Sequence, residues 1–62
     1  PLGDNLWEIR SHLDNRIVRI LFFIRETKMV LVHAFIKKTN KIPLKDLELA
    51  RNRKQKFLSY EV

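Results

Sequence analysis

An apolar run that passes directly into a cluster of lysines constrains this chain more than any other feature. The run reads MVLVHAFIKKTNKIP and spans Met29 to Pro43. Its apolar residues 29–32 predict a strand that lies centrally in a sheet or is covered on both faces. Lys37, Lys38 and Lys41 follow where the strand leaves the core. A rigid strand that delivers flexible basic side chains to a sheet edge favours phosphate contact over a metal ion or a small apolar ligand.

Length and composition restrict the chain to one small domain, residues 1–62. A chain this short buries only about 60% of its unfolded surface, and without cysteine it has neither disulfides nor Cys-bound zinc. Its two histidines are too few for a metal site, so we predict neither metal nor cofactor. A single glycine excludes a P-loop or a dinucleotide-binding loop, and no Ser/His/Asp triad or carboxylate pair is visible.

The charge balance indicates an anionic partner. Thirteen Lys and Arg residues against seven Asp and Glu give a net charge of +6. Nucleic acid is the first partner that this favours, an acidic protein the second and a membrane surface the third, with a merely soluble basic domain as the alternative. No apolar run approaches the ~20 residues of a membrane span. The lack of cysteine fits the cytoplasm, where we expect this protein.

Two segments before residue 29 show strand periodicity. Residues 6–10 alternate, with Trp7 and Ile9 on one side and Glu8 and Arg10 on the other. Residues 11–15 contain turn-forming residues and should link to a second strand at 16–25, which is rich in β-branched and aromatic residues. A tight turn at 26–27 would lead to the third strand. The fold class expected is α+β, a three-stranded antiparallel sheet followed by a C-terminal helix.

A two-residue turn at 26–27 sets a register for the second hairpin. The cross-strand pairs expected are Ile24–Met29, Phe22–Leu31, Ile20–His33 and Val18–Phe35. One face is then entirely apolar and continues through Trp7 and Ile9, whereas the mixed face groups Glu8, Arg10 and Arg19 close to Ala34. A slip of one residue would reverse the faces.

Residues 43 to about 58 predict the helix, with Pro43 at its first position after a poor N-cap, Ile42. Apolar residues recur at helical spacing and should dock on the sheet: Leu44, Leu47, Ala50 and Phe57. Acidic residues near the helix start and basic ones near its end suit the macrodipole. Residues 59–62 should form a tail, and residues 1–5 a linker or a remnant of tag cleavage.

Arg10 and Arg19 are the first site candidates, because an arginine on a half-buried strand must be paired or must serve a ligand. An ion pair between Glu8 and Arg19 is equally compatible with the sequence. His33 could be a general base, but a hydrogen-bonded core histidine is the commoner state at such a position. His12, placed in the first turn, could titrate freely.

The basic clusters have two interpretations each. Lys37, Lys38 and Lys41 could bind an RNA backbone and stabilise charge on a phosphorane, or they could form a solvated loop. The run of residues 51–56 is either solvated or part of a surface for RNA or a partner protein.

Four segments together carry a resemblance. They are LWEIR at 6–10, RILFF at 19–23, HAFIKKTNKIP at 33–43 and ELA at 48–50. They resemble the phage-derived, HigB-like branch of the RelE toxin superfamily, whose pattern reads L-W-E-L-R, Y-R-I-F-Y-F and H-x-F-x-K-K-T-x-K-T-P. The resemblance spans residue 6 to about 57, and the H-x-F-x-K-K-T-x-K-x-P run is its specific part.

The chain also departs from this family. Val18 stands where the family usually has Tyr, and Ile42 where it has Thr. Such toxins usually begin with a further strand and a pair of helices, which are absent here. The apolar face around Trp7 and Ile20 would then lack its usual cover, so a separate N-terminal segment or another chain is an expected partner.

The resemblance implies a toxin of a type II toxin–antitoxin system, a ribosome-dependent endoribonuclease (mRNA interferase) that inhibits translation. Attack of the ribose 2′-OH on the adjacent phosphate would cut mRNA without a metal. By position, Arg10 and Arg19 would be catalytic residues that clamp the phosphate, and Lys37 and Lys38 would stabilise the developing charge. His33 would be a further catalytic residue. The RNA-binding residues would be Lys41, Arg16, Arg51 and Arg53. The implied partners are mRNA on the ribosome and a cognate helix-turn-helix, HigA-like antitoxin. A truncated, non-catalytic module that binds RNA or the antitoxin is the alternative.

Overall fold

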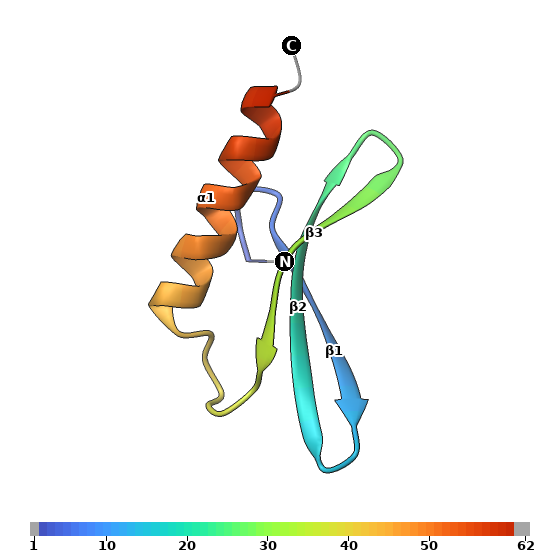
Figure 1. The fold of residues 1–62 in the computed structure, drawn as a ribbon, viewed down its shortest axis with the longest axis vertical. Coiled ribbons are helices and arrows are strands. Elements are labelled where there is room, and N and C mark those ends of the chain that lie inside the picture. The colour runs from blue at the N-terminus through green and yellow to red at the C-terminus, as the bar shows by residue number, and fades with distance from the viewer. Residues whose placement is uncertain (1, 61–62) are drawn as a thin grey trace.

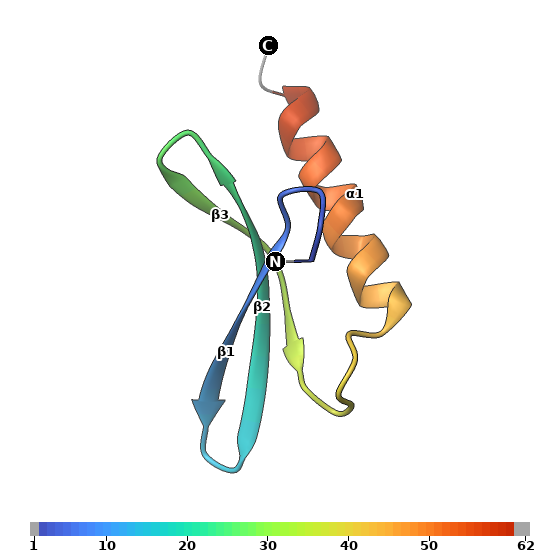
Figure 2. The ribbon, with the colours of Figure 1, turned by 180° about the vertical axis from the view of Figure 1, so that it is seen from behind.

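The computed structural model describes residues 2–60 as a three-stranded antiparallel sheet with one helix along one side (Figure 1). The elements are β1 (Trp7–Leu13), β2 (Arg16–Arg25), β3 (Lys28–Ile36) and α1 (Leu44–Tyr60), and the strand order is β1-β2-β3. The view from behind shows the N-terminal turn between α1 and the sheet (Figure 2). The predicted α+β class is confirmed.

Both hairpins close through two-residue turns. In each turn the first residue has a positive φ, 56° at Asp14 and 59° at Glu26. A left-handed first residue matches the right-handed twist of the flanking strands, at a steric cost for a residue other than glycine. The first turn comes later than predicted, because β1 continues through Leu13. His12 therefore lies in a strand, and its predicted place in the turn is wrong.

A β-bulge changes the predicted register of the second hairpin. The pairs Ile24–Met29 and Phe22–Leu31 are as predicted, whereas Leu21–His33, Ile20–Ala34, Arg19–Phe35 and Val18–Ile36 replace the predicted pairs Ile20–His33 and Val18–Phe35. The residue without a partner is Val32, which is buried. Its carbonyl oxygen accepts a hydrogen bond from Arg53 Nη1 at 2.9 Å. The helix thus satisfies a polar group that the bulge removes from the ladder.

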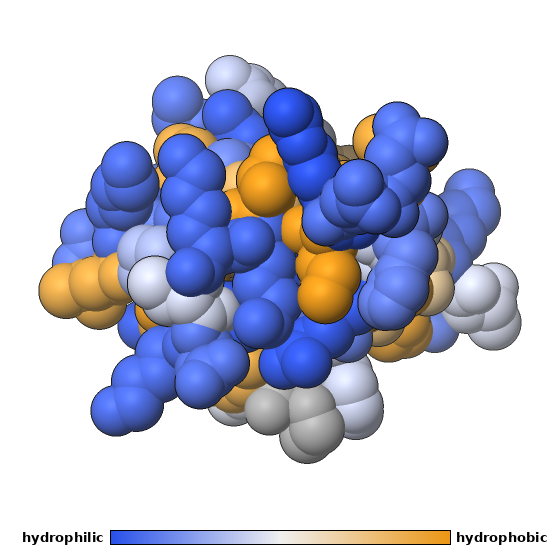
Figure 3. Space-filling view, turned by 90° about the horizontal axis from the view of Figure 1, so that it is seen from below, coloured by the Kyte–Doolittle hydropathy of each residue, from blue (hydrophilic) through white to orange (hydrophobic). Residues whose placement is uncertain are grey.

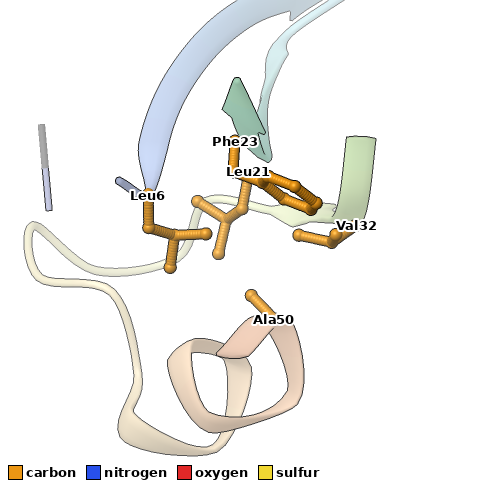
Figure 4. Packing of buried hydrophobic residues seen from close by; sticks show 5 residues of the cluster. All are labelled: Leu6, Leu21, Phe23, Val32 and Ala50. Atoms are coloured by element: carbon orange, nitrogen blue, oxygen red, sulfur yellow. The ribbon is translucent and has the colours of Figure 1, made fainter. Parts of the chain in front are cut away.

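The core lies on the mixed face of the sheet. Figure 4 shows Ala50 of α1 directed toward a cluster on the sheet and the N-terminal turn, namely Leu6, Leu21, Phe23 and Val32. Phe57 adds an edge-to-face contact with Phe23, at 5.5 Å between ring centroids. We call this side of the sheet the covered face.

The opposite side of the sheet, the open face, is lined by the residues that alternate with the core residues. They are Trp7, Ile9, Ser11, Leu13, Arg16, Val18, Ile20, Phe22, Ile24, Met29, Leu31, Ala34 and Ile36. No described element covers this face (Figure 1). β3 is an edge strand, so the prediction that residues 29–32 are central or covered on both faces is wrong. Met29 and Leu31 expose 51% and 60% of their surface.

The helix differs from the prediction at both ends. Pro43 precedes it, and the Pro43 carbonyl accepts bonds from the backbone N–H groups of Asp46 and Leu47. Pro43, and not Ile42, thus occupies the N-cap position. Leu44 does not dock on the sheet, since it is 65% exposed. At the other end α1 continues to Tyr60, so its last turn contains no basic residue, contrary to the expected polarity.

Residues 2–6 form an ordered turn. Leu2 N donates to the Leu6 carbonyl at 2.7 Å, Leu6 N donates to the Gly3 carbonyl at 3.0 Å, and the Asn5 side chain donates to the Ile24 carbonyl at 2.8 Å. Leu2 packs against the core. Of the predicted tail, Ser59 and Tyr60 are helical. Pro1, Glu61 and Val62 lie outside the described residues.

Candidate anion-binding site

Glu8, Arg10 and Arg19 lie together on the covered face, as the alternation of β1 predicts. Arg10 and Arg19 are directly opposite each other in the β1–β2 ladder, and Glu8 is two residues before Arg10. Glu8 Oε2 lies 2.9 Å from Arg19 Nε, and Glu8 Oε1 lies 3.4 Å from Arg10 Nε. One carboxylate therefore bridges two guanidinium groups. Ala34, which we expected beside them, pairs with Ile20 on the open face, so that part of the prediction is wrong.

Arg19 is a buried anchor in this cluster. Its side chain is 1% exposed, and Nη2 donates to the Asn40 carbonyl at 2.6 Å. The contact with Glu8 has the distance of an ion pair but not the geometry of a hydrogen bond. Arg19 Nη1 is buried without a partner among the described residues. Such a group costs about 1–3 kcal/mol unless a ligand or water binds it.

These side chains line a recess, which we call the Glu8 recess, of about 360 Å³. Its lining comes from the N-terminal turn, β1, β2, the loop before α1 and α1 itself: Leu2, Glu8, Arg10, Arg19, Asn40, Lys41, Ile42 and Leu47. Three cations and one carboxylate leave a local excess of positive charge. The volume is near the lower end of small-molecule sites, enough for a phosphate and part of its sugar. Seen from the end with the β1–β2 turn, hydrophilic side chains dominate the surface around a few hydrophobic ones (Figure 3).

The three predicted lysines do not form one site: Lys41 and Lys38 line different hollows, and Lys37 lines neither. Lys41 lines the Glu8 recess. The backbone N–H of Lys37 donates to the Ile17 carbonyl at 2.7 Å, which extends the pairing past β3 and places Lys37 on the covered face, beyond Phe35. Lys38 lines a separate hollow of about 410 Å³ at the start of α1, together with Lys45. The structure therefore brings Arg10, Arg19 and Lys41 together, and places Lys38 apart from them.

His33 takes part in a network between β3 and α1. Its Nε2 lies 2.8 Å from Asp46 Oδ1, its Nδ1 lies 3.4 Å from Arg53 Nη1, and its ring stacks on Phe35. If Arg53 donates to Nδ1, then Nε2 carries the proton and donates to Asp46. His33 does not line the Glu8 recess. The geometry is that of a histidine that fixes the helix to the sheet.

The remaining predicted RNA-binding arginines lie away from the recess. Arg16 is exposed at the start of β2, on the open face. Arg53 is engaged by Val32 and His33. Arg51 faces Asp4 at 4.0 Å and lines a hollow between the N-terminal turn and α1. These three arginines come from different surfaces and form no common site.

Sequence reasoning missed two residues of the recess as functional candidates. The sequence predicted Glu8 only as an ion-pair partner of Arg19, although its spacing of two from Arg10 places both residues on one face. The sequence carries no signal for Asn40, because its contact with Arg19 is made by the backbone carbonyl, which any residue at that position supplies.

Other kinds of site find little support in the described residues. Nowhere in residues 2–60 do three or more His, Asp or Glu side chains gather in a way that could hold a metal ion. Within the same range, α1 lacks the length and apolar character to cross a membrane.

Comparison with known proteins adds one finding. The family model for phage-derived proteins that are Gp49-like (DUF891) matches residues 1–55. This family is related to the toxins of toxin–antitoxin systems. No curated protein and no solved structure matches the chain.

Proposed function

This chain belongs to the Gp49-like family of phage-derived proteins, and from that premise we propose that it is a toxin domain that cleaves RNA. The finer form of the proposal is a HigB-like, ribosome-dependent endoribonuclease that cuts mRNA and so arrests translation. A cognate antitoxin would bind it in the cytoplasm and keep it inactive.

The observation that carries the proposal is the Glu8 recess. It joins two guanidinium groups around one carboxylate, and Lys41 lines the same recess, at the end of the sheet where the basic loop begins. Arginine is suited to phosphate because its planar donors match two phosphate oxygens. Arg10, whose side chain is 53% exposed, can make this contact directly. Arg19 is buried, so its role is to hold Glu8 and the Asn40 carbonyl in place beneath Arg10.

The reaction that fits this arrangement is transesterification at phosphorus. The 2′-oxygen forms a bond to phosphorus while the bond from phosphorus to the 5′-oxygen breaks, which leaves a 2′,3′-cyclic phosphate and a 5′-hydroxyl. The 2′-OH proton must pass to a base and the leaving oxygen must gain a proton. Glu8 is the carboxylate that lines the recess and can accept the first proton. Arg10 and Lys41 stabilise the negative charge that develops on the phosphorane oxygens.

A cleavage assay on mRNA in a translating extract tests the proposal. The full chain should produce defined 5′ ends within the translated region, and Arg10→Ala should reduce the cleavage rate at least tenfold. The matched control is Lys28→Ala, at the distant end of the hairpin, which should leave the rate unchanged. If no new 5′ ends appear with folded protein at micromolar concentration, the chain is not an active nuclease.

A second candidate function is a non-catalytic module that binds RNA or the antitoxin. The burial of Arg19 and its engagement by Glu8 favour it, because a guanidinium that is 1% exposed does not reach a phosphate in this conformation. Binding without chemistry predicts RNA affinity that falls steeply with salt while the RNA remains intact. Gel analysis of the RNA recovered from such a titration separates the two functions.

A further inference from the structure

A second hollow near the Glu8 recess has no part in the proposed reaction. We call it the Phe35 hollow, and its volume of about 410 Å³ is similar to the 360 Å³ of the recess. Its lining comes from the end of β3, the loop 37–43 and the start of α1, and includes Phe35, Lys38, Thr39, Pro43, Lys45 and Asp46. An aromatic ring combined with cationic side chains is the arrangement with which proteins bind single-stranded nucleic acid.

The loop 37–43 contributes a wall to both hollows. It joins the end of β3 to the start of α1 (Figure 1). Lys38 and Thr39 line the Phe35 hollow, whereas Asn40 and Lys41 line the Glu8 recess. Because Lys38 and Lys41 are three positions apart, their Cα atoms lie at most about 11 Å from each other. Neighbouring nucleotides of one strand can therefore occupy both hollows.

Phe35 offers a fixed platform for a base. Its ring stacks on that of His33, with 5.2 Å between the ring centroids and 22° between the ring planes. The His33 ring is itself held by Asp46, whose Oδ1 lies 2.8 Å from Nε2. Phe35 also packs against the core, yet it is only half-buried and lines the hollow. Stacking a base on a ring that is already held costs little side-chain entropy.

Lys38 and Lys45 are the charged groups of the hollow that remain available to a ligand. Both are exposed, and within residues 2–60 neither ammonium group makes a hydrogen bond or an ion pair. The Thr39 hydroxyl already donates to the Lys41 carbonyl at 2.6 Å, and the Asp46 carboxylate is engaged from β3. Two lysines against one carboxylate leave the lining with a net charge of +1, which favours an anionic group.

We propose that the Phe35 hollow binds the nucleotide next to the one whose phosphate lies in the Glu8 recess, so that a single strand of RNA crosses the loop 37–43. The base stacks on Phe35, and the phosphate lies between the ammonium groups of Lys38 and Lys45. This second subsite rests on the proposed function, because it presupposes that the Glu8 recess binds RNA. Stacking accepts every base, so the subsite adds affinity and not sequence preference.

Fluorescence anisotropy with a short, labelled 2′-O-methyl RNA measures binding to the full chain without cleavage, because this RNA lacks the attacking hydroxyl. Lys45→Ala should weaken binding about fivefold at 0.1 M salt. Lys56→Ala is the matched control. It removes the same charge from an exposed position roughly 16 Å farther along α1, and it should change the affinity less than about twofold.

A second pair of variants tests the platform. Phe35→Leu keeps an apolar side chain but removes the ring, and it should weaken binding at least about fivefold. Phe57→Leu removes a ring near the other end of α1 and should change the affinity less than about twofold. Circular dichroism checks that each variant is folded. Should Phe35→Leu fail to fold, Lys45→Ala still tests the subsite, because Lys45 is exposed.

An RNA with one abasic position identifies the stacked base. As the abasic position is moved along the strand, one place should weaken binding to the wild-type chain about fivefold and leave binding to Phe35→Leu unchanged. The two changes are then not additive, because they remove the same contact. Equal abasic effects on the two proteins at every position would show that no base stacks on this ring, and would overturn the subsite.

Two further outcomes would also overturn the subsite. If Lys45→Ala weakens binding no more than Lys56→Ala, RNA responds only to net charge, and the hollow is left to an acidic protein. If the wild-type chain shows no saturable binding, the RNA site in the Glu8 recess is lost as well. Failure of the nuclease function is a different result: a chain that binds RNA with the expected variant effects but cuts no mRNA retains the subsite and loses the proposed activity.

Discussion

The two faces of the sheet are built from alternate residues of the same strands, yet they differ in composition and in whether the helix covers them. The covered face combines a small apolar core with a buried arginine and a carboxylate. The open face is almost uniformly apolar and is covered by no described residue. Hydrophobicity alone would assign the core to the open face. The helix instead packs over the mixed side, where the polar groups find partners, and no described element covers the apolar side.

The comparison predicts its largest effect at Arg19. Arg19→Met removes the cation of the ion pair. The Glu8 carboxylate, whose side chain is 17% exposed, then loses its buried counter-charge. Breaking a buried pair in this way costs about 3–5 kcal/mol, much of the stability of a small domain. Urea denaturation measures the loss. Arg10→Met is the control, and it should cost less than about 1 kcal/mol because Arg10 is half exposed.

A double variant distinguishes the ion pair from simple packing. Glu8→Gln combined with Arg19→Met removes both charges and should recover most of the lost stability. If the double variant is as unstable as Arg19→Met alone, the arginine stabilises the covered face through its volume, and the contrast between a polar and an apolar face is weaker than we infer.

The second prediction compares one leucine from each face. Leu21, on the covered face, is fully buried, so Leu21→Ala should lower the free energy of unfolding by about 2–5 kcal/mol. Leu31, on the open face, is 60% exposed, so Leu31→Ala should cost less than about 1 kcal/mol in dilute monomeric protein. Thermal unfolding followed by circular dichroism gives both values. Equal losses would mean that the open face is buried in the folded monomer.

The sequence alone predicted the elements well and the positions of the side chains less well. Period-two alternation marked β1 and β2, and the helix followed from spacing after Pro43, because both are local properties. The register was correct only up to Phe22 and Leu31. Beyond that point the bulge at Val32 depends on a hydrogen bond from Arg53, 21 residues away. A contact of that range leaves no mark in the local pattern.

The candidate site shows the same limit. Alternation placed Glu8, Arg10 and Arg19 on one side of the sheet, which the structure bears out. The burial of Arg19 was not predictable, because it depends on the Asn40 carbonyl in a loop that folds back over β2. Charge alone could not show which lysines approach the recess. Their separation depends on the path of the chain between β3 and α1.

The third prediction concerns how α1 is held on the covered face. Asp46→Asn removes a carboxylate from the first helical turn and weakens its contact with His33. Loss of the dipole interaction and of a charged hydrogen bond should together cost about 1–1.5 kcal/mol. Glu48→Gln, on the exposed side of the helix, should cost less than about 0.5 kcal/mol. Urea titration of both variants checks the difference, and equal values would make the His33–Asp46 contact energetically unimportant.

The smallest effect is expected at Lys41, and it tests whether the covered face is the one that binds RNA. Lys41→Ala removes one cation from the Glu8 recess. Each phosphate contact contributes about 0.7 to the salt slope for single strands, so the slope should fall by about that amount and the affinity at 0.1 M salt by about fivefold. Lys28→Ala removes an equal charge at the far end of the hairpin and should leave the slope nearly unchanged. If the two variants lower the slope equally, RNA responds only to the net charge of the chain, and neither face has a specific phosphate site.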